Sequence, residues 1–279
     1  MRKTGSFFRS IVPFLAAVAL QLAVSIPLNI VYMFLYAAEN DGGLTGFSDA
    51  INAASSDTAL IQAVNLVYGI LAFLVFVFWY RRVFVLPFRK KKREARTDQR
   101  PSGFSFHNVL ALIFLAVSLQ YVTTFVVDIA SGLHPAWLES YTGMMETVGY
   151  SNASVILIIY SVILAPIVEE TIFRGLIFRY ARIALPFWAA NIWQALLFGI
   201  LHMNVLQGIY AFTVGLVLGF ICHRGRGIKY SILLHMLFNI IGVFYSGLIE
   251  LTTALNYPLF MGIGIALTAF ALWLFYTDF

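Results

Sequence analysis

The chain has 279 residues, of which 61% are hydrophobic and only 11% are charged. A soluble domain carries about 25% charged residues, so the composition excludes an ordinary soluble domain and indicates an integral membrane protein. Long apolar runs predict helices, because a transmembrane barrel would alternate with period two. The single cysteine, Cys222, excludes internal disulfides and cysteine-rich metal sites.

We expect an all-α, polytopic bundle of about eight transmembrane helices with cytoplasmic N and C termini. Residues 1–150 are expected to hold the first three helices and a basic cytoplasmic loop at 81–106, and residues 151–279 a catalytic membrane core packed with them as one transmembrane domain. Residues 39–57 and 131–151 are expected as outer loops. The expected spans are 11–38, 59–80, 108–130, a fourth from Asn152 or Ser154 to the acidic residues 169–170, 186–203, 205–222, 228–248 and 258–276.

The net charge of +5 would suit nucleic acid or anionic lipid, and its distribution decides between them. Lys and Arg cluster at 81–100, whereas the expected outer loops carry acids and no Lys or Arg. Such one-sided charge marks the cytoplasmic side and attracts anionic lipid. We therefore expect an anionic-lipid contact at the basic loop, no nucleic acid, and a multi-pass protein of the cell membrane or an endomembrane. The sequence leaves the oligomeric state open.

The fourth expected span contains two adjacent acids, Glu169 and Glu170, and one arginine, Arg174. Each ionisable group costs about 2.5–3.5 kcal/mol at a helix centre, so such groups indicate a functional site. Glu170 and Arg174 lie about 40° apart around a helix and are expected to pair, which leaves Glu169 free to face a cavity. The alternative is that all three lie among headgroups. Pro166 frees a helix carbonyl that needs water or a polar side chain as a partner.

Polar side chains also follow one face of the fifth expected span. Asn191, Phe198 and His202 share this face, with Gln194 at its margin. A polar stripe in an apolar helix faces protein or water. The alternative is an ordinary ladder of interhelical hydrogen bonds, which suits Asn191 and Gln194 better than His202.

His235 and Asn239 are i and i+4 on the seventh expected span and share a face. Both can donate hydrogen bonds, although they could also simply join helices. If spans four and five form a hairpin that turns near Pro186, Glu169 and His202 reach the same height, about 25 Å from the turn. The remaining histidines, at positions 107, 134 and 223, are expected to be solvated.

Three segments resemble the motifs of one family. Glu169–Arg174 resembles its EExxxR motif, Phe198–His202 its FxxxH motif, and His235–Asn239 its HxxxN motif. The family is the CAAX protease and bacteriocin-processing family, which includes the Rce1-type prenyl-protein endopeptidases. The resemblance covers about residues 150–245.

The resemblance implies a glutamate-dependent intramembrane endopeptidase. By it, Glu169 is the general base for water and His202 orients that water. His235 and Asn239 donate to the oxyanion, and the expected ion pair of Glu170 with Arg174 supports them. These roles suit peptide hydrolysis, which needs a base beside the water and donors where negative charge develops. The HExxH pattern of soluble metalloproteases is absent. Two acids and two histidines could hold zinc, but we favour a metal-free mechanism without a cofactor.

The expected substrate is a peptide bond in a membrane-associated or lipidated protein. It would be a CAAX-type tail or, in a bacterium, a peptide or bacteriocin precursor. Two other functions stay open at this stage. One is a non-proteolytic immunity or signalling partner in the membrane, and the other is a haem protein or ion carrier that uses the same histidines and acids.

Overall fold

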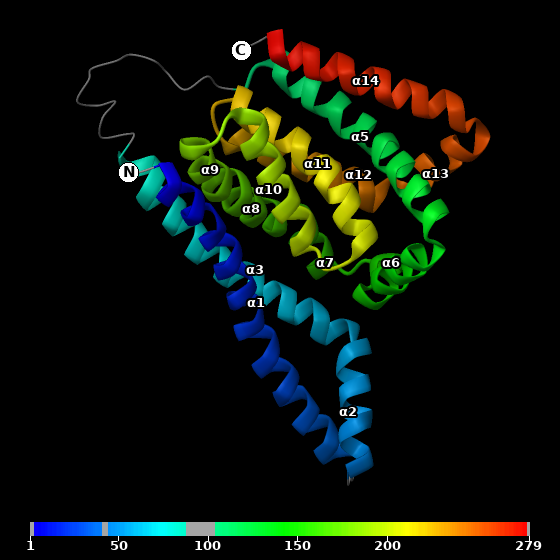
Figure 1. Cartoon of the computed structure of the whole chain (residues 1–279). Helices are drawn as coiled ribbons and strands as arrows, with labels where there is room; N and C mark the ends of the chain where they lie inside the picture. Colours follow the sequence, from blue (N-terminus) through cyan, green and yellow to red (C-terminus); the bar gives the residue numbers. More distant parts are fainter. Residues whose placement is uncertain (1–2, 41–43, 88–103, 278–279) are drawn as a thin grey trace.

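The computed structural model describes residues 3–40, 44–87 and 104–277, and helices dominate all three ranges (Figure 1). Three short segments are π-helical, at Arg81–Val85, Tyr160–Leu164 and Thr171–Ile177, and the last two join α7, α8 and α9 into one span. The α-helices are α1 (Lys3–Glu39), α2 (Leu44–Ser56), α3 (Thr58–Tyr80), α5 (Phe106–Leu133), α6 (Pro135–Val148), α7 (Val155–Ile159), α8 (Ala165–Glu170), α9 (Phe178–Ala184), α10 (Phe187–Leu201), α11 (Val205–Arg224), α12 (Ile228–Phe244), α13 (Ser246–Leu255) and α14 (Tyr257–Thr277).

Six helical segments of the described chain are long and apolar enough to cross a membrane. They are Thr4–Glu39, Thr58–Val85, Phe106–Leu133, Val155–Ala184, Val205–Arg224 and Tyr257–Thr277. The pair α12 and α13 adds a seventh if it counts as one span, although it bends by 73°. The all-α, multi-pass membrane fold is therefore confirmed. The expected number of eight is not reached by this measure, because α10, with 15 residues, is shorter than a span.

The two segments expected as outer loops are largely helical, because residues 39–57 contain α2 and residues 131–151 contain α6, and their outer placement stays a prediction. Both helices lack the long apolar run that predicts a span. In α2, Gly46, Ala50 and Ala54 recur at every fourth position and are buried, and α2 packs against α1. A Cβ atom at Gly46 would meet nothing within 4 Å, so the small side chains of Ala50 and Ala54 form the packed part of this stripe. Asp57 then starts α3, where its carboxylate accepts hydrogen bonds from the Leu60 N–H and the Tyr32 hydroxyl, both at 2.8 Å.

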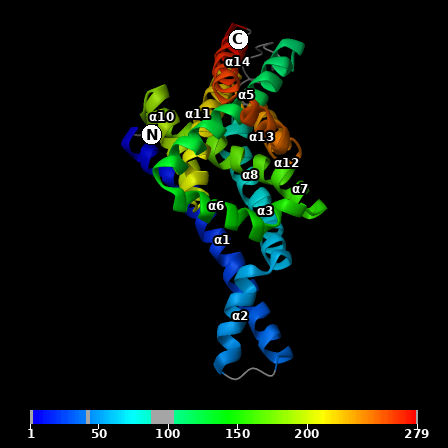
Figure 2. The same cartoon turned by 90° about the vertical axis from the view of Figure 1, so that its right-hand side faces the viewer.

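The helices pack in three groups. Helices α5 and α14 lie side by side, α10 and α11 form a hairpin, and α1 and α3 pack along the fourth span (Figure 1). The end of α1 and all of α2 project beyond the other helices, at the end of the molecule away from both termini (Figures 1 and 2). The termini thus lie on one side, as the predicted topology requires, and their cytoplasmic placement stays a prediction.

The α10–α11 hairpin depends on two glycines. A Cβ atom at Gly199 would lie 2.5 Å from the backbone oxygen of Gly208, and one at Gly208 would lie 3.0 Å from the oxygen of Gly199. No side chain fits at either place without moving a backbone. This close approach brings the C-terminal end of α10, where His202 lies, against the start of α11.

Candidate active site in the membrane core

The fourth span starts with a capped turn and is interrupted twice. The Ser154 hydroxyl accepts the Leu157 N–H at 3.1 Å and donates to the Gln62 side chain at 2.6 Å, so Ser154 rather than Asn152 is the cap. The acidic residues then end α8 between the π segments Tyr160–Leu164 and Thr171–Ile177. Inserted π turns are frequent at functional sites because they change which side chains share a face.

The ion pair predicted between Glu170 and Arg174 is confirmed. Arg174 Nη1 lies 2.8 Å from Glu170 Oε1, and both side chains are 0% exposed. Arg174 Nη2 also donates to the Gly215 carbonyl at 3.1 Å, and the guanidinium lies 4.5 Å from the centre of the Phe198 ring. The pair is therefore enclosed by protein, and the alternative placement among headgroups is wrong for it. Glu169 differs, because its side chain is 21% exposed.

His235 connects the two acids. Its Nδ1 lies 3.0 Å from Glu170 Oε1, and its Nε2 lies 3.7 Å from Glu169 Oε2. An ionised carboxylate only accepts, so Nδ1 carries the proton of this hydrogen bond. Arg174 and His235 thus donate to the same oxygen of Glu170 and hold it in one position. Nothing in the spacing of the sequence indicated that His235 would contact the acids.

Asn239 supplies the hydrogen-bond donor that Pro166 lacks. In the π segment the Ala165 N–H bonds to the Tyr160 carbonyl, so the next residue, Pro166, would bond to the Ser161 carbonyl if it had an N–H. Asn239 Nδ2 donates to that carbonyl instead, at 2.7 Å. The polar partner expected for the freed carbonyl is therefore a side chain from α12, and the hydrogen bond joins α12 to the π segment.

The contribution of the Asn239 hydrogen bond to stability can be measured. We expect Asn239→Ala to cost about 1–3 kcal/mol of stability, because it strands the Ser161 carbonyl. Pro166→Ala restores a backbone N–H in the right register, so the double variant should lose less stability than the sum of the two single variants. Thermal unfolding in detergent measures all four proteins. Strictly additive losses would show that Asn239 and Pro166 do not compete for this carbonyl.

His202 lies directly after α10, and its tautomer follows from its contact. Nδ1 is 2.8 Å from the Phe198 carbonyl, which can only accept, so Nδ1 carries a proton and Nε2 of the neutral ring is an acceptor. The Phe198 ring is 2% exposed and makes edge contacts with His202 at 4.9 Å and with His235 at 5.8 Å. Phe198 therefore contacts both imidazole rings and also packs on the Arg174 guanidinium.

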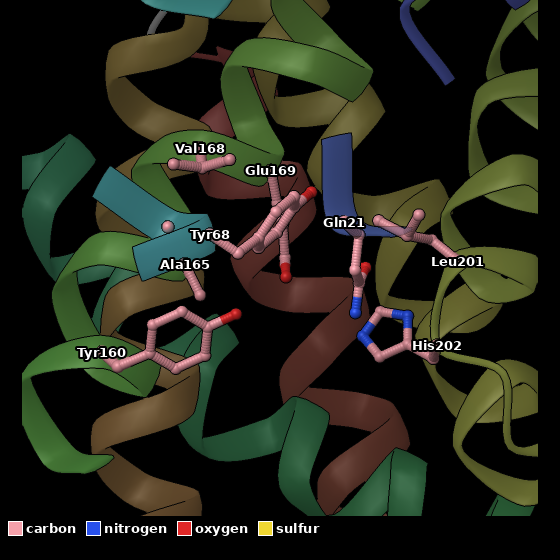
Figure 3. Close-up of a pocket in the computed structure, with 9 residues that line it drawn as sticks. Gln21, Tyr68, Tyr160, Ala165, Val168, Glu169, Leu201 and His202 are labelled. Atoms are coloured by element: carbon pink, nitrogen blue, oxygen red, sulfur yellow. The ribbon is translucent and has the colours of Figure 1, made fainter. Parts of the chain in front are cut away.

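Glu169 and His202 line one cavity of about 110 Å³ (Figure 3). In this view Tyr160 and His202 enter from opposite sides and Glu169 lies between them. The cavity has room for several waters, since one water needs about 10–15 Å³ by this measure. The prediction that spans four and five bring these two residues to one height is confirmed, and the chain turns between them at Leu185 and Pro186.

The N-terminal helices supply part of the cavity, which the sequence did not indicate. Gln21 of α1 and Tyr68 of α3 line it together with Tyr160. A glutamine in an apolar helix is a signal of burial or function and could have drawn attention to Gln21. A tyrosine in such a helix is no comparable signal, because interfacial tyrosines are common in membrane proteins.

Other polar residues of α10 are structural. Asn191 Nδ2 donates to the Leu216 carbonyl at 2.9 Å, and Gln194 Nε2 donates to Asn191 Oδ1 and to the Gly215 carbonyl, both at 2.9 Å. For these two residues the hydrogen-bond ladder was the correct alternative.

The three remaining histidines, His107, His134 and His223, are exposed and lie outside the cavity. The His223 ring also stacks on Phe187 at 4.5 Å.

Most of the basic loop lies outside the described residues, so the lipid contact stays a prediction. No group of three or more His, Cys, Asp or Glu side chains in the described ranges is arranged to hold a metal ion.

Comparison with known proteins finds one similarity, and it covers this site. Residues 151–241, about a third of the chain, match the family model described as type II CAAX prenyl endopeptidase Rce1-like. A search of the curated proteins found no match, and a search of the solved structures found none either. The matched segment contains Glu169, Glu170, Arg174, His202, His235 and Asn239. Residues 151–241 are therefore similar to the Rce1-like family of type II CAAX prenyl endopeptidases.

Proposed function

We propose that the protein is an intramembrane endopeptidase that hydrolyses a peptide bond with a water activated by Glu169. The observation that carries this proposal is the shared cavity of Glu169 and His202 within the membrane core. The family match supports the same reaction class. The proposal does not extend to haem or ion transport, which no contact of the site favours.

The two residues have complementary tasks. A water between them donates one hydrogen to the Glu169 carboxylate and the other to Nε2 of His202, which leaves a lone pair for the peptide carbonyl carbon. As the new C–O bond forms, the proton passes to Glu169 and the carbonyl oxygen becomes an oxyanion. When the C–N bond breaks, Glu169 returns that proton to the leaving amine. General base catalysis of this kind contributes about 10²–10⁴-fold.

The buried side chains of Glu170, Arg174 and His235 position the general base rather than the substrate. Glu170 receives hydrogen bonds from Arg174 and His235, which fixes the helix turn that carries Glu169. The expected role of His235 and Asn239 as oxyanion donors stays a proposal. In this structure Nδ1 of His235 is used by Glu170 and Nδ2 of Asn239 by Ser161, so a positioning role is the better supported one.

The substrate we propose is a membrane-associated peptide, and by the family match a prenylated C-terminal tail. The cavity lies among apolar spans, so a peptide anchored in the bilayer would be concentrated beside it, whereas a free hydrophilic peptide would not.

The test uses the full chain in lipid nanodiscs and a pair of C-terminal peptides that differ only in a prenyl group. We expect cleavage of the prenylated peptide, little cleavage of its partner, and loss of cleavage in His202→Ala. The matched control is His107→Ala, because His107 is exposed at the start of α5 and away from the cavity. Equal activity of wild type and His202→Ala would refute the assigned role of His202.

Membrane peptidomics extends the test to unknown substrates. Membranes that contain the wild type should gain peptides that are missing from membranes with Glu169→Gln. Identical peptide sets would favour the non-proteolytic partner described above.

A further inference from the structure

The proposed reaction needs a donor that faces the developing oxyanion. Such donors must lie about 2.7–3.1 Å from the oxyanion. Neither His235 nor Asn239 is among the residues that line the cavity. His235 Nδ1 donates to Glu170, and one N–H of Asn239 Nδ2 donates to the Ser161 carbonyl. The side chains that do line the cavity are therefore searched for a further donor.

Three lining side chains carry donors without a hydrogen-bond partner in the part of the chain that the structure describes. They are the Gln21 amide and the hydroxyls of Tyr68 and Tyr160. In Figure 3 the Gln21 amide lies beside the His202 ring, whereas the Tyr160 hydroxyl points into the open space between Glu169 and His202. That space is where the attacked carbonyl would lie, since the water is held by the other two groups.

We propose that the Tyr160 hydroxyl donates a hydrogen bond to the oxyanion of the tetrahedral intermediate. This inference rests on the proposed endopeptidase function. The hydroxyl keeps its proton throughout, since Glu169 takes the proton of the water and returns it to the amine, so the atoms and charges of the reaction are unchanged. Tyr160 contributes by lowering the energy of the charged intermediate.

The structure holds the Tyr160 ring rigidly enough for this task. A Cβ atom at Gly69 of α3 would lie 3.0 Å from Tyr160 Cε2 and 2.8 Å from Leu164 Cδ2, so the ring is packed directly against a glycine backbone. The Tyr160 carbonyl is bonded to the Ala165 N–H, and the next carbonyl, of Ser161, is bonded to Asn239. The start of the π turn is thereby bonded both to the residue that follows the turn and to α12.

This arrangement assigns Asn239 an indirect role. Asn239 positions Tyr160 through the hydrogen bond that it donates to the Ser161 carbonyl. Pro166 creates the need for this hydrogen bond by lacking an N–H. The segment from Tyr160 through Pro166 to the two acids thus acts together with Asn239 of α12.

Tyr160→Phe tests the inference, because it removes the hydroxyl and keeps the ring against Gly69. We expect kcat to fall about 10²–10³-fold with KM within about threefold of wild type, as for the loss of one oxyanion donor. A peptidyl phosphinate, which imitates the tetrahedral intermediate, should bind this variant about 10²-fold more weakly by the same reasoning. A structural role alone would not reduce phosphinate affinity while leaving KM unchanged.

Two further variants make the outcome decisive. Tyr68→Phe should lose less kcat than Tyr160→Phe. The double variant Asn239→Ala with Pro166→Ala should be more active than Asn239→Ala alone. A kcat of Tyr160→Phe within threefold of wild type, or a larger loss in Tyr68→Phe, would overturn the proposal. If wild type cleaves, Glu169→Gln does not, and Tyr160→Phe is unaffected, only this inference fails. If wild type shows no cleavage that depends on Glu169, the proposed function fails as well.

Discussion

Glu169→Gln is expected to abolish peptide cleavage while the protein keeps its fold. The amide has nearly the shape of the carboxylate but cannot take a proton from water, so the rate should fall by about 10²–10⁴-fold or to the detection limit. The side chain is 21% exposed and lines the cavity, and its carboxylate lies 3.7 Å from His235 Nε2. Its removal therefore strands no tightly bonded partner, and the melting temperature in detergent should stay close to that of wild type.

The control for this variant is Glu139→Gln. Glu139 is an exposed acid on α6, outside the cavity, and the same chemical change there should leave the rate unaltered. A second variant, Glu169→Asp, shortens the side chain by one methylene and should retain some activity, since the base persists at a greater distance. Wild-type turnover in Glu169→Gln would mean that another group activates the water.

Arg174→Met is expected to cause the largest loss of stability. It leaves the Glu170 carboxylate with no cation at 2.8 Å in a site that is 0% exposed. Breaking a buried ion pair on one side costs about 3–5 kcal/mol. The Gly215 carbonyl would also lose the Nη2 donor. Activity should fall with stability, because the Glu170 carboxylate would lose one of the two donors that hold it in position. Thermal unfolding and peptide cleavage in the same nanodiscs measure both effects.

The double variant Arg174→Met with Glu170→Gln separates charge from packing. Replacing both partners of a buried pair is often close to neutral, so most of the lost stability should return. His235 Nδ1 would keep an acceptor in the glutamine oxygen. The control Arg82→Met removes an exposed cation near the end of α3 and should change the melting temperature little. An Arg174→Met protein as stable as wild type would contradict the energetic importance of the pair.

The helix period explains which parts of the site could be predicted. Glu170 and Arg174 are four residues apart, and Glu169 and His202 lie at similar distances from the turn at Pro186, so simple helix geometry brought each pair together. The need for a partner near Pro166 followed from its missing N–H. In each case the relevant contact lies within one helix or across one short hairpin.

Contacts between distant helices could not be predicted in this way. Gln21 and Tyr68 reach the cavity because α1 and α3 pack along the fourth span, and no pattern in the first 150 residues specifies that packing. The contact of His235 with both acids depends on how α12 crosses α8. The π segments change the face on which Tyr160 lies, and α2 and α6 are too short and too polar to show as spans.

An experimental structure that resolves ordered water tests the central claim most directly, which is that one water is held between Glu169 and His202. Cryo-electron microscopy of the wild type in nanodiscs should show a water within about 3.2 Å of both the Glu169 carboxylate and His202 Nε2. His202 Nδ1 should remain bonded to the Phe198 carbonyl. A Glu169 carboxylate turned toward lipid, or separated from His202 too far for one water to bridge them, would contradict the account.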